Sequence, residues 1–242
     1  MQNMFFTIII LVTIFQPVKE ERYKPVVVLE LFTSQGCSSC PSADVLLSDI
    51  NRMYADKDVI TLSYHVDYWN YIGWKDPFSK KAFSDKQRDY SRKFFSSSIY
   101  TPQVVVNGKE HFVGSKKELM TANLKTYLSR FSENEVAISN VEKFKGLIKF
   151  DYEINGRTEN KKLRIALVIK ERETTVNRGE NKNRVLKNSN IVVRELYLDL
   201  NLRSGTAQIS IPELVLKTDD LSIIVLVENK DLDITGGSQM VL

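Results

Sequence analysis

Apolar residues near the start of the chain follow two patterns. Val26 to Phe32 is apolar except at Glu30, and Val59 to Tyr64 is a second mostly apolar run. Such runs are typical of strands that are buried on both faces. Between them, a helical spacing links Leu46, Leu47, Ile50, Met53 and Tyr54. The pattern therefore predicts a β-α-β unit with parallel strands and a right-handed crossover.

The chain from there to about residue 130 predicts two more helices and a hairpin. Aromatic residues at helical spacing predict a helix over about residues 79–95. Residues 103–106 and 109–113 are predicted to be strands joined by a two-residue turn at Asn107-Gly108. Helical periodicity returns over residues 115–128.

Beyond residue 130 the period changes to two. Apolar and polar residues alternate most clearly over residues 147–154 and 163–169. About seven such strands, without a convincing helix, predict a small β-sandwich. We therefore expect an α/β domain over residues 23–131, with a helical insertion at about 68–98. An all-β, sandwich-like domain is expected over residues 132–242.

The extreme N-terminus carries a different signal. Phe5 to Phe15 is apolar apart from two threonines, and charged residues follow it. Eleven residues are too few to cross a hydrocarbon core of about 30 Å as a helix. Residues 1–22 are therefore interpreted as a signal peptide or a short N-terminal anchor, with a buried first strand as the alternative. The first interpretation predicts export to the periplasm or cell envelope, with membrane contact only through that anchor.

Composition and charge exclude several classes of protein. The chain has 242 residues, of which 43% are hydrophobic and 26% charged, so a wholly disordered chain is excluded. The formal net charge of +4 is too small to indicate a nucleic-acid partner. Two cysteines and two histidines are also too few for a disulfide framework or a four-cysteine zinc site.

The two cysteines are the strongest indication of chemistry. Cys37 and Cys40 form a C-x-x-C pair where the first predicted strand turns into a helix. The start of a helix stabilises a thiolate, which is the form that attacks a disulfide. Cys37 is predicted to be the nucleophile, and Cys40 the resolving cysteine one turn further in. Pro41 requires the helix to begin late or to kink, because proline lacks a backbone N–H.

Topology brings further residues to the same edge of the sheet. His65 and Asp67 follow the second parallel strand, and Thr101-Pro102 opens the next one. His65 could tune the Cys37 thiolate or be an ordinary buried histidine. Asp67 could cap a turn or act as a base for Cys40. Pro102 is a candidate cis-proline that would keep metals off the sulfurs and shape a substrate groove, with Thr101 in support.

Aromatic residues are concentrated just after His65. They could form a platform for the substrate, although aromatic residues are more often part of a core. The candidates are Tyr68, Trp69 and Trp74.

The order of strand, C-x-x-C helix and Thr-Pro before a hairpin resembles the thioredoxin superfamily. More closely, the chain resembles a family of exported bacterial thioredoxin-like proteins of uncharacterised function. The motifs that carry this resemblance are Glu30 to Pro41, His65 to Trp69, Gly73-Trp74-x-Asp76, Arg88-x-Tyr90, Tyr100 to Gln103, Gly179-Glu180-Asn181 and Asn190 to Arg194. The resemblance implies a thioredoxin-like α/β fold for the N-terminal domain and a β-rich C-terminal domain.

The sequence thus predicts an exported thiol–disulfide oxidoreductase that needs no cofactor, because its electrons reside on two sulfurs. Its expected partners are a protein or small-molecule thiol or disulfide and an electron-transfer partner. One alternative is an envelope protein that binds copper or another soft metal through Cys37 and Cys40. Another is an envelope interaction module whose disulfide is only structural.

Overall fold

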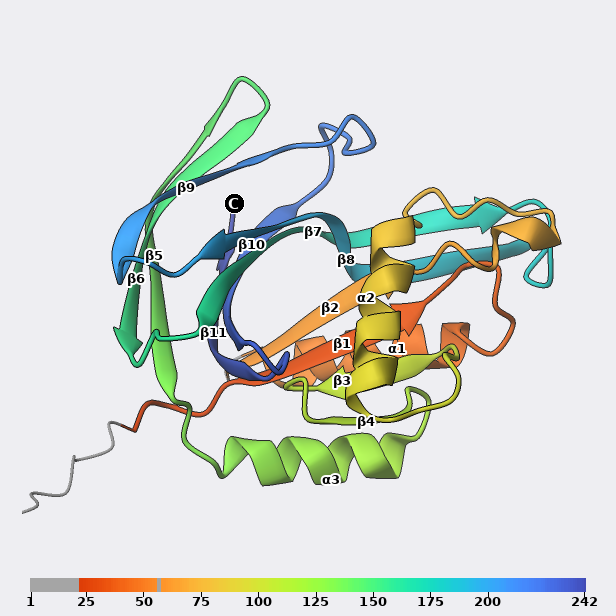
Figure 1. Cartoon of the computed structure of the whole chain (residues 1–242). Helices are drawn as coiled ribbons and strands as arrows, with labels where there is room; N and C mark the ends of the chain where they lie inside the picture. The colour runs from red at the N-terminus through yellow and green to blue at the C-terminus, as the bar shows by residue number, and fades with distance from the viewer. Residues whose placement is uncertain (1–21, 56–57) are drawn as a thin grey trace, which may run out of the picture.

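One mixed sheet of eight strands organises the molecule (Figure 1). The computed structural model describes residues 22–55 and 58–242. The strand order of the large sheet is β11-β10-β7-β8-β2-β1-β3-β4. Its strands in chain order are β1 (Val27–Thr33), β2 (Val59–His65), β3 (Gln103–Val106), β4 (Glu110–Val113), β7 (Lys161–Val176), β8 (Arg184–Asp199), β10 (Leu221–Asn229) and β11 (Ile234–Val241).

The predicted β-α-β unit is confirmed. Strands β1 and β2 pair in parallel along their whole length, from Val27–Val59 to Thr33–His65. The connecting helix α1 (Pro41–Met53) buries its apolar side against β1. The other helices are η1 (Asn70–Ile72), α2 (Lys81–Lys93) and α3 (Lys117–Leu128). Strands β3 and β4 form the predicted hairpin, with Asn107 and Gly108 both at positive φ in its turn.

The expected fold class, a thioredoxin-like α/β domain followed by a separate β-sandwich, is wrong. Strands from before and after residue 131 share the eight-stranded sheet. The connection is the parallel pairing of β8 with β2 at Ser63–Ile191, where the Ser63 hydroxyl donates to the Ser189 carbonyl at 2.8 Å. Residues 163–169 of β7 were expected to alternate between a buried and an exposed face, as in a sandwich strand. In the structure all of them are buried, so both faces of the strand are covered. Such a strand belongs inside a covered sheet.

Both faces of the large sheet are covered. A second sheet, in the order β5-β6-β9, consists of β5 (Asn134–Phe144), β6 (Leu147–Gly156) and β9 (Ser204–Ser210). Its apolar face packs on β7, β8 and β10. On the same face of the large sheet, α1 and α3 cover β1 and β3, whereas α2 packs on the opposite face (Figure 1). These layers leave the C-terminal ends of β1 and β2 at one end of the molecule.

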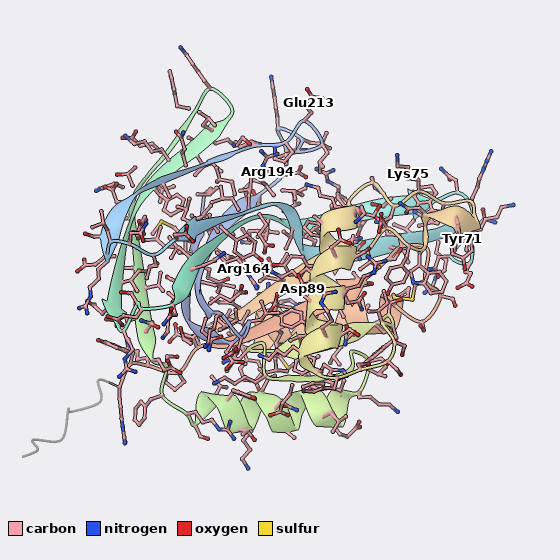
Figure 2. The ribbon with its side chains drawn as sticks, in the orientation of Figure 1. Tyr71, Lys75, Asp89, Arg164, Arg194 and Glu213 are labelled. Atoms are coloured by element: carbon pink, nitrogen blue, oxygen red, sulfur yellow. A yellow bond between two sulfur atoms is a disulfide. The ribbon has the colours of Figure 1, made fainter. Side chains whose placement is uncertain are left out.

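A buried arginine connects the two halves of the large sheet. Arg164 of β7 contacts Glu30 of β1 and Glu228 of β10, each at 2.6 Å, and Glu195 of β8 at 3.3 Å. Its side chain is fully buried, and Figure 2 shows it inside the molecule. Tyr90 of α2 adds a hydroxyl group that donates to Glu30. Three carboxylates around one guanidinium therefore link four strands of the sheet.

The predicted signal peptide or anchor over residues 1–22 lies, apart from Arg22, outside the described residues. Among the helices that the structure describes, none is both long enough and apolar enough to span a membrane.

Candidate functional site

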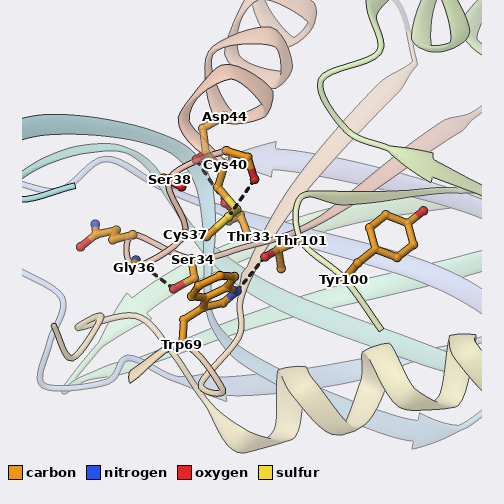
Figure 3. Close-up of a disulfide and its surroundings, with 12 residues drawn as sticks. Thr33, Ser34, Gly36, Cys37, Ser38, Cys40, Asp44, Trp69, Tyr100 and Thr101 are labelled. Carbon is orange, nitrogen blue, oxygen red and sulfur yellow. Dashed lines mark hydrogen bonds between the residues drawn. A yellow bond between two sulfur atoms is a disulfide. The ribbon is translucent and has the colours of Figure 1, made fainter. Parts of the chain in front are cut away.

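A disulfide joins Cys37 and Cys40 at the start of α1 (Figure 3). Cys40 is the N-cap residue of this helix and Pro41 is its first residue. Proline is well suited to this position, because the first N–H groups of a helix have no partner within it. The helix therefore begins directly after the C-x-x-C pair, without a kink. The two predicted redox cysteines are within bonding reach of each other and are bonded.

Both cysteines are buried, so the predicted nucleophile Cys37 is no more accessible than Cys40. Cys37 is 1% exposed and Cys40 is 0% exposed, whereas Ser38 and Ser39 between them are exposed. The Ser39 hydroxyl lies 3.4 Å from the Cys37 sulfur. It is therefore placed to donate a hydrogen bond to a thiolate at Cys37.

The tip of the β7–β8 hairpin contacts the cysteine loop, which is residues 34–40 between β1 and α1. The buried side-chain amide of Asn181 donates to the carbonyls of Gln35 and Cys37, both at 2.9 Å. The carboxylate of Glu180 accepts the backbone N–H of Ser38 at 2.9 Å. The sequence motif Gly179-Glu180-Asn181 contains these residues, but nothing in the sequence placed them beside the cysteines.

A buried carboxyl group lies one helical turn beyond Cys40. Asp44 is 5% exposed, and one of its oxygens accepts the Thr33 hydroxyl at 3.1 Å. Its other oxygen has no hydrogen-bond partner within the described part of the chain. Burial raises the pKa of Asp44 to about 7, although the nearby positive charge of His65 acts against this. Asp44 can therefore gain and lose a proton near neutral pH.

His65 lies at the end of β2 and pairs with Asp76 rather than with a cysteine. The distance between His65 Nδ1 and Asp76 Oδ2 is 2.7 Å, and both side chains are fully buried. Burial acts to lower the pKa of His65, but the Asp76 carboxylate outweighs it and the pKa is raised. Asp76 also accepts the backbone N–H of Gln35 at 2.8 Å. The pair thus supports the residues that lead into Cys37.

Asp67 and Tyr68 are tied to α2. The Ser84 hydroxyl donates to the Asp67 carboxylate at 2.5 Å, and the Asp67 N–H donates to the Ser84 oxygen at 3.0 Å. The Tyr68 hydroxyl donates to Gln87 at 3.1 Å. These contacts fit the turn-capping interpretation of Asp67 and hold Tyr68 against a helix.

The tryptophans pack around the cysteine loop. The indole N–H of Trp69 donates to the Thr101 hydroxyl at 2.7 Å, directly below the disulfide in Figure 3. The indole of Trp74 donates to the side chain of Gln35 at 3.2 Å. The Thr101–Pro102 peptide bond is cis, as predicted. Figure 2 shows Tyr71, which is 84% exposed, at the same end of the molecule as the disulfide.

No metal site is evident in residues 22–55 and 58–242, where no group of three or more histidine, cysteine, aspartate or glutamate side chains could hold an ion. A pocket of about 1060 Å³ is lined mainly by α2, β8 and the turn after β10. None of the residues around the disulfide lines this pocket, so it does not belong to this site.

Two comparisons with known proteins cover most of the chain. A family model described as a protein of unknown function, DUF1223, matches residues 28–228. A crystal structure of a protein from Agrobacterium tumefaciens is 26% identical, with a TM-score of 0.67, and the match covers 91% of this chain and 95% of that chain. No curated protein matches the chain.

Two solved structures resemble only part of the chain. A DUF3823 family protein from Bacteroides ovatus is 17% identical, with a TM-score of 0.31, over 46% of this chain and 57% of that one. A domain of the outer membrane lipoprotein Omp28 from Porphyromonas gingivalis is 13% identical, with a TM-score of 0.29, over 46% of this chain and 96% of that domain.

Proposed function

Because this chain belongs to the DUF1223 family of proteins of unknown function, its activity must be inferred from its site, and we propose that it is a thiol–disulfide oxidoreductase. The observation that carries the proposal is the Cys37–Cys40 disulfide at the start of α1, with the protonatable side chain of Asp44 on the next turn. Burial raises the pKa of Asp44 to about 7, and carboxyl groups perturbed in this way cluster at functional sites.

In the reduced protein, Cys37 is the attacking thiolate. The start of α1 and the Ser39 hydroxyl favour its ionised form. The thiolate attacks a substrate disulfide, which forms a mixed disulfide and expels one substrate thiolate. Cys40 then loses its proton and attacks the Cys37 sulfur, which releases the second substrate thiolate and forms the Cys37–Cys40 bond. The substrate gains two electrons, and the protein loses them.

Asp44 is proposed to handle the proton of Cys40. It follows Cys40 by four residues, so the two side chains lie on the same side of α1 (Figure 3). Ionised Asp44 accepts the Cys40 proton during the resolving step. In the reverse direction, protonated Asp44 returns a proton to Cys40 as it leaves. A pKa of about 7 allows both roles near neutral pH.

The reaction needs no organic cofactor, and its partners are proposed to be a protein or small-molecule thiol or disulfide and an electron-transfer partner. Export to the periplasm or cell envelope is also proposed. Its support is the apolar run from Phe5 to Phe15, followed by charged residues, in the sequence.

Trapping tests the proposed activity. In Cys40→Ser, the resolving step cannot occur, so mixed disulfides should accumulate on Cys37 in cells of the source organism. Non-reducing gels of the affinity-purified variant should show adducts that a reductant removes. The control Cys37→Ser lacks the nucleophile and should show none. If neither variant forms adducts, the protein is not an oxidoreductase and its disulfide is structural.

A further inference from the structure

The tip of the β7–β8 hairpin, residues 177–183, is held directly against the cysteine loop. Three hydrogen bonds join the two segments: Asn181 to the carbonyls of Gln35 and Cys37, and the N–H of Ser38 to Glu180. Asn181 is fully buried, and its side-chain oxygen accepts the guanidinium of Arg184 at 2.7 Å. These contacts bridge more than 140 residues of sequence, so they belong to the tertiary fold alone.

Packing is close at two glycines of this contact. A Cβ added to Gly179 in the tip would lie 3.3 Å from Trp74 Cβ and 3.4 Å from Ile72 Cδ1. A Cβ added to Gly36 in the cysteine loop would lie 3.2 Å from Trp69 Cβ. Trp69, Ile72 and Trp74, which follow β2, therefore pack against these two segments. Disulfide exchange requires an attacking thiolate to reach a sulfur atom, and Cys37 is 1% exposed.

We propose that residues 177–183 form a cover that must move before Cys37 can react, with Asn181 as its positioning residue, and that reduction of the disulfide loosens it. This inference rests on the proposed function, since it assigns a regulatory element to the same site. It explains why a pair of cysteines suited to exchange is out of contact with solvent.

Charge gives the reason that reduction would loosen the cover. In the oxidised protein Cys37 is neutral, and the carboxylate of Glu180 accepts a hydrogen bond from the backbone N–H of Ser38, just before α1. A thiolate at Cys37 would be attracted to the same positive end of the helix and would repel the carboxylate of Glu180. Other charged groups near the cysteine loop are Asp44 on α1, the His65–Asp76 pair and Arg184 beside Asn181. The tip itself also carries Arg178 and Lys182.

Energetic coupling must act in both directions. If the closed position of the cover is favoured more in the oxidised than in the reduced protein by some factor, the closed cover favours the disulfide over the dithiol by that same factor. Weakening the cover should therefore make the protein easier to reduce at equilibrium as well as faster to reduce.

The rate of reduction by dithiothreitol tests the cover. One thiolate of this probe attacks Cys37 and breaks the bond to Cys40, and its second thiol then displaces Cys37 to form the cyclic disulfide of the probe. In Asn181→Ala, we expect the rate constant to rise about tenfold, because two hydrogen bonds to the cysteine loop are lost.

The control is Asn177→Ala, because Asn177 is exposed in the same tip and contributes no side-chain hydrogen bond to the cysteine loop. It should remain within about twofold of the parent. Equal rates for the two variants would overturn the proposal.

Hydrogen exchange of the unmodified protein is a second measurement, which does not depend on how well a variant folds. Amides of residues 177–183 should exchange faster after reduction, while those around the β5–β6 turn at Lys145-Gly146 should not change. Glu180→Gln retains an acceptor for Ser38 but removes the charge, so it should reduce this redox-dependent difference. Identical exchange in both redox states would contradict the cover.

These results are independent of the trapping experiment. Dithiothreitol reports access to the disulfide whether or not a physiological substrate exists. If trapping fails but Asn181→Ala is reduced faster, the oxidoreductase proposal is overturned and the cover is supported. If trapping succeeds but the reduction rates are unchanged, the cover is overturned and the oxidoreductase proposal is supported.

Discussion

Replacing Arg164 with methionine is expected to lower the free energy of unfolding by about 3–5 kcal/mol. Methionine leaves Glu30, Glu195 and Glu228 without their shared guanidinium in the interior of the protein. Unpaired buried carboxylates are destabilising because burial favours the neutral form of the group. Urea unfolding at pH 7, followed by circular dichroism, measures the change.

A matched control is Arg52→Met on α1. Arg52 pairs with Asp49 at the surface, where its side chain is 67% exposed, so the loss should be below about 1 kcal/mol. Adding Glu30→Gln and Glu228→Gln to Arg164→Met should recover part of the lost stability, because two charges are removed with their partner. An Arg164→Met variant as stable as Arg52→Met would show that the buried cluster does not hold the halves of the sheet together.

Replacing Asp44 with asparagine is expected to stabilise the oxidised protein at high pH, by up to about 4 kcal/mol at pH 8. Burial raises the pKa of Asp44 in the folded protein to about 7, from 3.8 in a free carboxyl group. Between these values the unfolded chain releases the proton and the folded chain keeps it. The stability associated with Asp44 is therefore fully present below about pH 4 and is lost as the pH rises to about 7. Asparagine stays neutral in both states and avoids this loss.

Unfolding free energies at a series of pH values between 4 and 8 test this expectation. The two proteins should be nearly equal in stability at about pH 4 and diverge above it. Asp49→Asn on the same helix is the control, because Asp49 is 44% exposed and forms only a surface pair with Arg52. A difference between Asp44→Asn and the parent that does not vary with pH would contradict a titrating, buried Asp44.

The sequence was sufficient for local structure and insufficient for the pairing of the strands. Runs of apolar residues correctly predicted β1, α1 and β2, and the Asn107-Gly108 turn correctly predicted the β3–β4 hairpin. Strand periodicity does not reveal partners, however, so the pairing of β8 with β2 was missed. One signal was available in two charges of opposite sign, Glu30 and Arg164, that interrupt buried runs. Such residues need a partner in the interior.

In the candidate site, too, features set by neighbouring residues were predicted and contacts between distant residues were not. The C-x-x-C spacing and its place before a helix predicted a pair of cysteines that can bond, and Thr101-Pro102 was predicted to be cis. Asp44 could have been found as a carboxylate one helical turn beyond Cys40. Asn181 could not, because only the folded hairpin of β7 and β8 carries it back to the cysteine loop.

The distance in sequence between Cys37 and Asn181 also sets an order of events during synthesis. The two residues are 144 positions apart. A ribosome that adds about 5–20 residues per second makes Asn181 roughly 7–30 s after Cys37. During that interval the nascent chain presents both thiols without the hairpin that later lies over them. A chain that is oxidised in this interval reacts as an open dithiol, whereas the completed protein has to move the proposed cover before it reacts again.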